Sequence, residues 1–594
     1  MKQETLDRLL SRVEKPTRYM GEELNLIRKD AFDVSFALCF PDVYEIGMSH
    51  LGSRILYNVL NGMDGVACER CYAPWTDMEQ ALREEGEPLF TLETRRPLRS
   101  FDIVGFSLLY EMCYTNILTM LDLSGIPFCA AERDESYPLI VAGGPCCCNP
   151  EPVAPFFDAI MIGDGEEIIV ELTNAVREAK RNHTPKRELL KQLKGMRGMY
   201  VPALTEPGER VVKRIVKDLD GATFTGKPIV PYMNIVHDRV AIEVMRGCTR
   251  GCRFCQAGYI YRPVRERKSE TVMRIAREQI ACTGYDEISL LSLSTGDYSE
   301  VHTLVPEIIH EMENNRVSVS LPSLRVDSVL REDFGVMQSV RKAGLTFAPE
   351  AGTQRLRDVI NKNVTEEDIL RATLDAFTSG WHSVKLYFMM GLPTETDDDI
   401  RGIADLARKI SRQFYALPKE QRGKGLRLSV SVSTFVPKPF TAFQWYAQNP
   451  LDEIRRKQEL LRSAMKGIRG TELHMHLSSL SVLEAAFSRG DKRLADVLIE
   501  AYSRGCRFDS WSEHFKPAAW KEAFAACGLT AEEYAEREYS VDTVLPWSFV
   551  DMLVTEEYLK KEYQLSVEGR TTNDCREHCN GCFGKAYATD CSLS

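Results

Sequence analysis

Three cysteines, Cys248, Cys252 and Cys255, lie within eight residues of one another. They follow a short apolar run, Ala241 to Met245, which predicts a buried strand, so the loop that carries them begins at a strand end. Three thiolates can ligate three of the four irons of a 4Fe-4S cluster, which leaves one iron open for chemistry. The alternatives are a structural zinc site, which needs a fourth nearby Cys or His, and chance clustering.

A second set of cysteines, Cys575, Cys579 and Cys582, repeats this spacing near the end of the chain, and Cys591 follows. Four thiolates can close a metal site completely, which suits a structural or electron-relaying centre. We therefore expect a second Fe-S cluster in this tail. Zinc, with His578 as an alternative ligand, and cysteines without metal are the alternatives.

The overall composition limits the class of protein. A chain of 594 residues is too long for one core, so we expect two or three domains. Its net charge of −11 argues against a large non-specific nucleic-acid footprint. The first residues carry no secretory signal, and no run approaches the ~20 apolar residues that a bilayer span needs. These features predict a cytoplasmic protein without a membrane anchor.

Eighteen cysteines in such a chain need an explanation. Disulfide frameworks belong to small proteins of oxidising compartments, so cysteines at ligand spacing favour metal or cluster binding. We expect the others to be buried apolar residues, including Cys68, Cys71 and the run Cys146 to Cys148.

The pattern of apolar runs divides the chain into four parts. Over residues 1–180, buried strands alternate with helices, which predicts a doubly wound parallel sheet. Residues 181–239 read as a linker followed by a β-hairpin, with its turn at Glu206 to Gly208. Over 240–446, six strand candidates alternate with helices and fit a partial (β/α)6 barrel. Residues 447–594 are mainly helical and end in the Cys-rich tail, so the fold class is α/β.

The cysteine loop and the barrel pattern resemble the radical S-adenosylmethionine (SAM) superfamily. In that superfamily SAM chelates the open iron, and an electron from the cluster breaks a carbon–sulfur bond to give a 5′-deoxyadenosyl radical. The resemblance implies that SAM is bound by residues at the carboxyl ends of successive strands, namely Ser294, Gly296, Asp297, Ser323, Arg325, Glu350 and Gly391. The basic residues Arg262, Arg265, Arg267 and Lys268 either meet an anion or form a solvated charge run.

The first part of the chain resembles the cobalamin-binding domain that precedes some radical SAM barrels. Three short motifs that follow predicted strands carry this resemblance: Asp42 to Gly47, Ser107 to Leu109, and Gly143-Gly144. Tyr44 stands where the cobalt-ligating histidine of many cobalamin folds would be. The resemblance therefore implies a cobalamin site that contains Ser107, Gly143 and Gly144 but lacks this ligand. A doubly wound domain without the cofactor is the alternative.

The layout of the whole chain resembles a family of cobalamin-binding radical SAM proteins of anaerobes. This resemblance does not settle the reaction. The leading interpretation is a cobalamin-dependent transferase that methylates an unactivated carbon, with a reductant such as flavodoxin or ferredoxin. A second interpretation is methylthiolation or sulfur insertion without cobalamin, and a third is an Fe-S redox sensor that binds RNA or a partner. RNA, ribosomal protein and small molecules are all candidate substrates.

Overall fold

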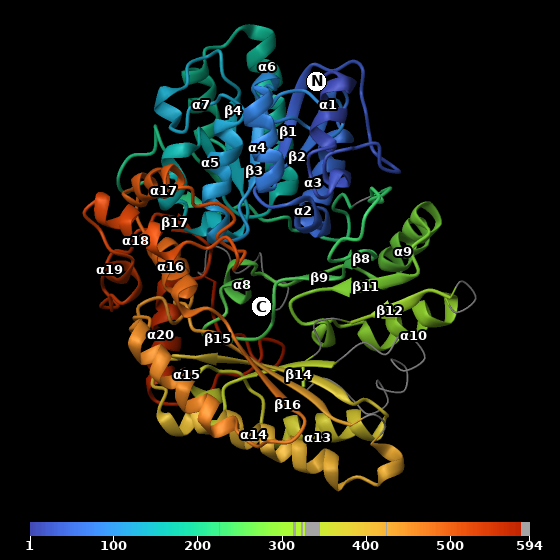
Figure 1. The fold of residues 1–594 in the computed structure, drawn as a ribbon, viewed down its shortest axis with the longest axis vertical. Coiled ribbons are helices and arrows are strands. Elements are labelled where there is room, and N and C mark those ends of the chain that lie inside the picture. Colours follow the sequence, from blue (N-terminus) through green and yellow to red (C-terminus); the bar gives the residue numbers. More distant parts are fainter. Residues whose placement is uncertain (225, 313–315, 322–324, 327–344, 423–424, 584–594) are drawn as a thin grey trace.

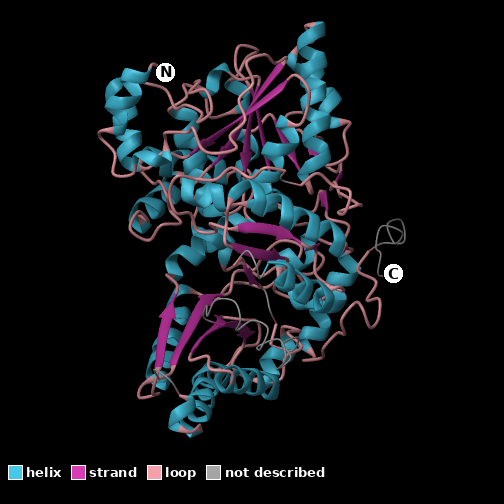
Figure 2. Cartoon of the chain, turned by 90° about the vertical axis from the view of Figure 1, so that its right-hand side faces the viewer, coloured by secondary structure: helices cyan, strands magenta, loops and turns pink. Residues whose placement is uncertain are grey.

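The computed structural model describes residues 1–594 except 225, 313–315, 322–324, 327–344, 423–424 and 584–594. Its three larger sheets lie at three levels along the long axis of the molecule (Figures 1 and 2). The N-terminal sheet is at the top, a small sheet lies in the middle, and a four-stranded sheet lies at the bottom.

The N-terminal sheet has the strand order β2-β1-β3-β4-β5-β6. The first five strands are parallel, and β6 joins the edge antiparallel to β5. This order is the flavodoxin-like doubly wound arrangement, so the predicted parallel sheet is confirmed. The strands are β1 (Val34–Phe40), β2 (Val66–Tyr72), β3 (Ile103–Ser107), β4 (Leu139–Gly143), β5 (Ala159–Met161) and β6 (Met199–Tyr200).

Helices cover both faces of this sheet. On one face, α3 (Leu51–Asn61) and α6 (Gly165–Asn182) share a buried cluster with Cys68. On the other, α4 (Thr76–Glu85) and α5 (Tyr114–Asp122) share a second cluster with Cys71. The two cysteines of β2 are therefore buried on opposite faces of the sheet, as a strand with a period of two requires for residues three apart. Cys146 to Cys148 are buried as well.

The β-hairpin expected between residues 200 and 217 is not formed. The turn exists, but β6 pairs with β5, and β7 (Val211–Val212) pairs with β17 (Val550–Asp551). The edge of the N-terminal sheet and a distant segment offer free backbone groups to these two short strands, so each pairs with another element. The expected linker also contains a helix, α7 (Lys186–Lys194), which packs against α6.

All six strands predicted for the barrel are present, but the described residues divide them between two sheets. The middle sheet has the order β12-β11-β8, and the lower sheet has the order β13-β14-β15-β16. Both are parallel, and β16 adds a seventh strand beyond residue 446. The strands are β8 (Val240–Glu243), β11 (Glu287–Leu291), β12 (Ser318–Ser320), β13 (Leu345–Glu350), β14 (Ser383–Met390), β15 (Arg427–Thr434) and β16 (Thr471–Met475).

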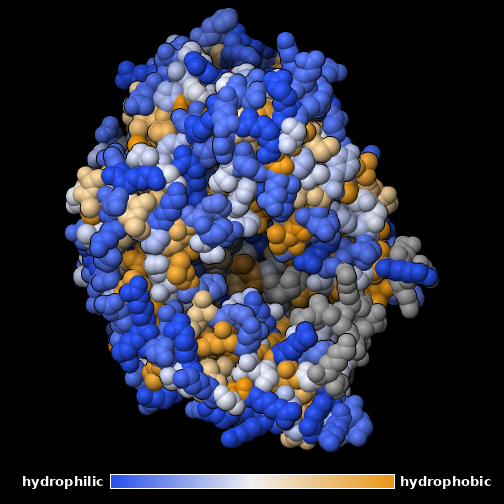
Figure 3. Space-filling model, in the orientation of Figure 1, coloured by the Kyte–Doolittle hydropathy of each residue, from blue (hydrophilic) through white to orange (hydrophobic). Residues whose placement is uncertain are grey.

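Helices follow these strands on the outer side, as a β/α pattern demands. They are α9 (Ser269–Thr283), α10 (Val301–Met312), α12 (Gln354–Val359), α13 (Glu366–Thr378), α14 (Asp397–Ala416) and α15 (Leu451–Met465). Figure 3 shows a hollow in the middle of one face, where the lower sheet and the upper part of the molecule approach each other.

The C-terminal helices run back from the lower sheet to the N-terminal domain (Figure 1). Helix α17 packs against α5, and α20 packs against α12. The helices are α16 (Ser478–Arg489), α17 (Leu494–Ser503), α18 (Pro517–Ala526), α19 (Ala531–Ala535) and α20 (Glu556–Val567). Among the described helices, none combines the length and the apolar composition that crossing a bilayer requires.

Candidate functional site

The cysteine loop lies between two short elements in the middle of the molecule. It follows β9 (Met245–Arg246), which pairs antiparallel with β10 (Arg265–Glu266), and it ends at α8 (Gln256–Ile260). Gly247 opens the loop at a φ of 88°, and a Cβ there would lie 2.7 Å from the carbonyl oxygen of Pro263. Only glycine fits this close approach, because any side chain would clash with backbone.

The three thiols of this loop, Cys248, Cys252 and Cys255, lie close together and are half-buried. Burial and the neighbouring thiol of Cys252 raise the pKa of Cys248 to about 11 and that of Cys255 to about 12. Iron would have to displace these protons when it binds. No three His, Cys, Asp or Glu side chains of the described residues converge as ligands of one ion. A 4Fe-4S cluster does not need this convergence, because each thiolate binds its own iron.

Buried contacts from distant parts of the chain hold the loop in place. The guanidinium of Arg253 pairs with Glu562 of α20 at 3.0 Å, and both side chains are fully buried. The same guanidinium donates to the carbonyl oxygen of Val359, and Asn361 donates to that of Gly251 at 3.0 Å. The loop is therefore fixed between α12 and α20.

Asp297 of the turn after β11 also contacts the loop. Its carboxylate accepts a hydrogen bond from Ser294 Oγ and pairs with Arg250 at 2.6 Å and with Arg576 at 2.8 Å. Burial opposes ionisation, but hydrogen bonds from Arg250 and Ser294 lower the pKa of Asp297 to about 2. The carboxylate thus anchors the cysteine loop and the tail. That Ser294, Gly296 and Asp297 bind the SAM amino group stays a prediction.

Of the other residues expected around SAM, Glu350 and Gly391 lie at strand ends of the lower sheet, and Arg325 follows β12 of the middle sheet. Glu350 ends β13 with a φ of 67° and pairs with Lys362 at 3.2 Å, and Arg325 donates to the carbonyl oxygen of Lys362. The ammonium of Lys362 is near enough to Cys255 to act on its pKa, so this group faces the cysteine loop. Gly391 follows the neighbouring strand β14 with a φ of 85°. Ser323 lies outside the described residues.

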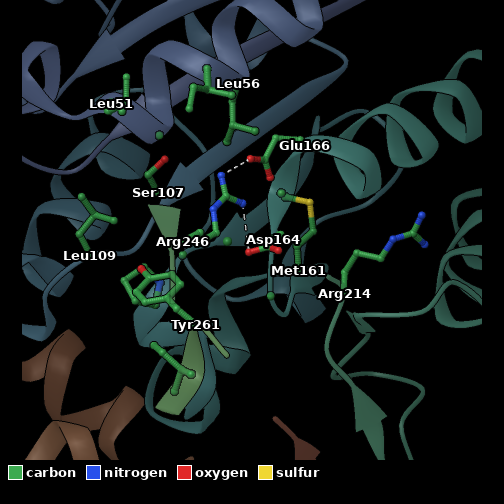
Figure 4. A pocket seen from close by; sticks show the side chains of 18 of the residues that line it. Leu51, Leu56, Ser107, Leu109, Met161, Asp164, Glu166, Arg214, Arg246 and Tyr261 are labelled. Atoms are coloured by element: carbon green, nitrogen blue, oxygen red, sulfur yellow. Dashed lines mark hydrogen bonds and ion pairs between the residues drawn. The ribbon is translucent and has the colours of Figure 1, made fainter. Parts of the chain in front are cut away.

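A cavity of about 370 Å3 separates the N-terminal sheet from the cysteine loop. Ser107, Gly143 and Gly144 line it from the carboxyl ends of β3 and β4, where doubly wound sheets bind ligands. Arg246 and Gly247, which precede Cys248, line it from the opposite side. Figure 4 shows that its wall also includes Leu51, Leu56, Leu109, Met161 and Tyr261.

The first of the three sequence motifs does not reach this cavity. The hydroxyl of Tyr44 is buried and donates to Glu23 at 2.9 Å, and Asp42 accepts from the indole of Trp511. The cavity is lined instead by His50, six positions later, which the sequence pattern did not single out. Burial lowers the pKa of His50 to about 4, and its Nδ1 accepts the backbone N–H of Ser53.

Ion pairs join the two walls of the cavity. Asp164, at the end of the N-terminal domain, pairs with Arg246 at 3.2 Å and with Arg265, and Glu166 pairs with Arg246 at 2.6 Å (Figure 4). Burial opposes ionisation of Asp164, but the two arginines lower its pKa to about 2. Arg262, Arg265 and Arg267 are all buried, so the alternative of a solvated charge run is wrong for them.

Two family models match the chain. The one described as "Radical SAM superfamily" matches residues 242–407, and the one described as "Radical SAM proteins, N-terminal" matches residues 52–202. Together they cover more than half of the chain. The chain belongs to the radical SAM superfamily.

Curated relatives resemble different lengths of this radical SAM enzyme. An uncharacterised protein of Methanocaldococcus jannaschii is 28% identical over 78% of this chain and 90% of the relative. A tRNA-2-methylthio-N(6)-dimethylallyladenosine synthase of Carboxydothermus hydrogenoformans is 25% identical over 34% of this chain and 47% of the relative.

Two solved structures of cobalamin-dependent enzymes are also similar. The radical SAM methyltransferase TsrM of Kitasatospora setae, with cobalamin and a 4Fe-4S cluster bound, has a TM-score of 0.47 at 15% identity. The match covers 67% of this chain and 72% of TsrM. OxsB with aqua-cobalamin and SAM bound has a TM-score of 0.46 at 13% identity, over 90% of this chain and 79% of OxsB.

Membership of the superfamily implies a 4Fe-4S cluster and SAM, and the cysteine loop of this radical SAM enzyme provides thiols for the cluster. The second cysteine set lies in the tail, which packs against the same loop through Asp574 and against Asp297 through Arg576. Cys575 is half-buried, Cys582 is buried and Cys579 is exposed. Cys591, predicted as the fourth ligand, lies outside the described residues. Neither set converges as a zinc site among the described residues.

Proposed function

We propose that this radical SAM enzyme methylates an unactivated carbon and that it holds cobalamin in the cavity between its N-terminal sheet and its cysteine loop. The position of the cavity supports this proposal most strongly. One wall is the carboxyl edge of a flavodoxin-like sheet, and the other leads through Arg246 and Gly247 directly into Cys248. A ligand in this space would contact both the carboxyl edge of the N-terminal sheet and the cysteine loop.

The lining of the cavity suits the apolar face of a flat ring that has polar groups at its edges. Its wall is mainly apolar, and the hydroxyl of Ser107 and the backbone of Gly143 and Gly144 offer polar contacts at one edge. We propose that Cys248, Cys252 and Cys255 hold the cluster and that Glu350 and Gly391 contact SAM. When bound, the cluster and SAM supply hydrogen abstraction, and cobalamin supplies methyl transfer.

The chain itself positions the reactants and excludes water. The ion pairs of Asp164 and Glu166 with Arg246 hold the two walls together. His50 is unsuited to ligate cobalt in this arrangement. Its Nδ1 accepts a hydrogen bond, so in the neutral ring the proton is on Nε2. We therefore propose cobalamin binding without a protein imidazole on cobalt.

Cobalt content and SAM cleavage test this proposal separately. The protein is reconstituted anaerobically with iron, sulfide and cobalamin, and 5′-deoxyadenosine is assayed under reduction with a flavodoxin or ferredoxin as donor. We expect about one cobalt per chain, and Leu56→Trp should abolish cobalt binding because the indole fills the cavity. Leu190→Trp changes a half-buried leucine of α7 outside the cavity lining and is the matched control.

Each outcome has a distinct meaning. Cobalt in the wild type and in Leu190→Trp, but not in Leu56→Trp, supports the cavity as the cobalamin site. No cobalt in the wild type contradicts it, even if SAM is cleaved. Cys248→Ala should abolish deoxyadenosine formation. A non-catalytic sensor would give no deoxyadenosine even with a full cluster.

A second candidate function is methylthiolation or sulfur insertion. It is favoured by the match to tRNA-2-methylthio-N(6)-dimethylallyladenosine synthases and by the packing of a second cysteine set against the cluster loop. This reaction needs no cobalamin. Sulfur transfer to RNA by protein without cobalt would establish it in place of the methyl transfer.

A further inference from the structure

The tail docks directly on the loop that carries the first three cysteines. The backbone N–H of Cys575 donates to the carbonyl oxygen of Thr249 at 3.1 Å. The carboxylate of Asp574 accepts from Thr249 Oγ1 at 2.9 Å and pairs with Arg250 at 2.8 Å. Thr249 is the neighbour of Cys248, so a backbone hydrogen bond links the two cysteine sets.

A buried guanidinium lies next to this contact. Arg262 is only 2% exposed, and it donates through Nε to Gly258 O at 3.0 Å and through Nη2 to Arg250 O at 2.9 Å. Its remaining nitrogen, Nη1, is buried and has no hydrogen-bond partner among the described residues. No described carboxylate forms an ion pair with it. The hydroxyl of Tyr558, whose ring lies 5.6 Å from the guanidinium carbon, is also buried without a partner.

A buried guanidinium that has no carboxylate partner and one unsatisfied nitrogen in the described part of the chain, beside a hydroxyl that is also unsatisfied, points to a missing anion. Burying an unpaired charge or an unsatisfied polar group is unfavourable, so such groups are normally matched in folded proteins. Apart from the tyrosines, the groups of the tail that act electrostatically on Arg262 are the thiols of Cys575 and Cys582. Neutral thiols do not compensate a guanidinium. Thiolates bound to iron, together with the sulfides of a cluster, do.

The cysteines are placed for this role. The carbonyl oxygen of Cys582 accepts the backbone N–H of Thr555, the residue that caps α20, so the backbone of this cysteine is held beside the positive end of a twelve-residue helix. Cys579 is exposed and lies between the other two in the sequence. Because the thiols do not converge on one point, a site with one iron per thiolate fits them better than a single zinc ion.

We propose that Cys575, Cys579 and Cys582 hold a second Fe-S cluster, packed against Thr249 and Arg250 of the first cluster loop and charge-compensated by Arg262. This site goes beyond the proposed methyl transfer and does not depend on it. Its place beside the loop would let it pass single electrons from a flavodoxin- or ferredoxin-type donor to the first cluster.

Iron counting in the full-length protein tests the site. After anaerobic reconstitution, we expect about eight irons per chain in the wild type and about four in Cys575→Ala/Cys582→Ala. The variant Cys248→Ala/Cys252→Ala/Cys255→Ala should also keep about four, with an electron paramagnetic resonance signal of a reduced cluster but no deoxyadenosine. Cys527→Ala, at a half-buried cysteine after α18, is the matched control and should keep about eight.

The proposal is wrong if the wild type holds about four irons and the triple variant holds none, or if the tail binds zinc. Should the tail variant fail to fold, the spectrum of the triple variant decides. In that triple background, Arg262→Gln should shift the midpoint potential to a more negative value, because reduction adds negative charge that the guanidinium stabilises. An unchanged potential would remove Arg262 from the site. None of these outcomes depends on cobalt binding.

Discussion

Asp509 is a buried carboxyl group between the C-terminal helices and the N-terminal domain. It accepts hydrogen bonds from the indole of Trp520 and the hydroxyl of Thr115, both at 2.7 Å. Burial raises its pKa to about 6, because these two neutral donors do not replace the lost hydration of the charge. A raised carboxyl pKa means that the folded protein prefers the protonated form.

This preference predicts that Asp509→Asn stabilises the protein relative to the wild type by an amount that depends on pH. The unfolded chain loses the proton near pH 4 and the folded chain near pH 6, so the wild type loses stability as pH rises through this window. Asparagine keeps the shape without the charge. In urea unfolding of the apoprotein, the free energy of unfolding of the variant minus that of the wild type should increase by about 1 kcal/mol between pH 5 and pH 7. A constant difference across this range would contradict the raised pKa.

The residues of the candidate site show what a single sequence can and cannot reveal. Ser107, Gly143 and Gly144 could be predicted because polar and glycine residues follow apolar strands, and parallel strands end at one edge. Leu56, Leu109 and Met161 could not be predicted as cavity residues, because an apolar residue that lines a cavity occupies the same kind of sequence position as one in the core. The partner of Asp297 was also hidden, since Arg576 lies 279 positions away.

At the scale of elements, α20 holds the cluster loop by burying Glu562 against Arg253. Breaking such a pair leaves an uncompensated buried charge, which typically destabilises by about 3–5 kcal/mol. We expect Glu562→Gln to release iron to a chelator much faster than the wild type does. Asp542→Asn breaks an exposed pair with Lys560 and should change the rate little, since such pairs contribute about 0–1 kcal/mol. Equal rates in both variants would exclude a special role for α20.

The strands show where pattern reasoning succeeds and where it fails. Strands made mostly of apolar residues, such as β1 and β4, are predictable because a parallel sheet is buried on both faces. Strand β2 contains Glu69 and Arg70, so its sequence does not have the pattern of a buried strand. Its charges are buried through partners elsewhere, for example the pair of Arg70 with Glu93 at 2.6 Å. The hairpin failed for the same reason, because its pairing partners lie far away in the sequence.

At the scale of the whole molecule, the N-terminal domain is joined to the barrel around the cavity by Asp164 and its arginines. We expect Asp164→Asn to lower the free energy of unfolding by about 3–5 kcal/mol. The ion pair of Arg246 with Glu166 remains in the variant and reduces this loss. Calorimetry should then resolve separate transitions for the two parts. Because the pKa of Asp164 is about 2, this loss should be constant between pH 6 and pH 8.

An exposed ion pair of the same domain is the control for this prediction. Asp33 pairs with Arg181 at 2.7 Å, with both side chains about half exposed or more. Asp33→Asn should change stability by less than about 1 kcal/mol and leave one transition. If Asp164→Asn behaves in the same way, the ion pairs at the cavity do not hold the domains together.

The contacts that hold the cysteine loop join segments that are synthesised at different times. The partners of Arg253 and Thr249 are Glu562 and Asp574, which are synthesised 309 and 325 positions later in the chain. At about 5–20 residues per second, the loop leaves the ribosome roughly 15–65 seconds before its clamp does. During this interval neither of these two contacts can form. The cysteine loop can therefore be fixed against α20 and the tail only after that part of the chain has been synthesised.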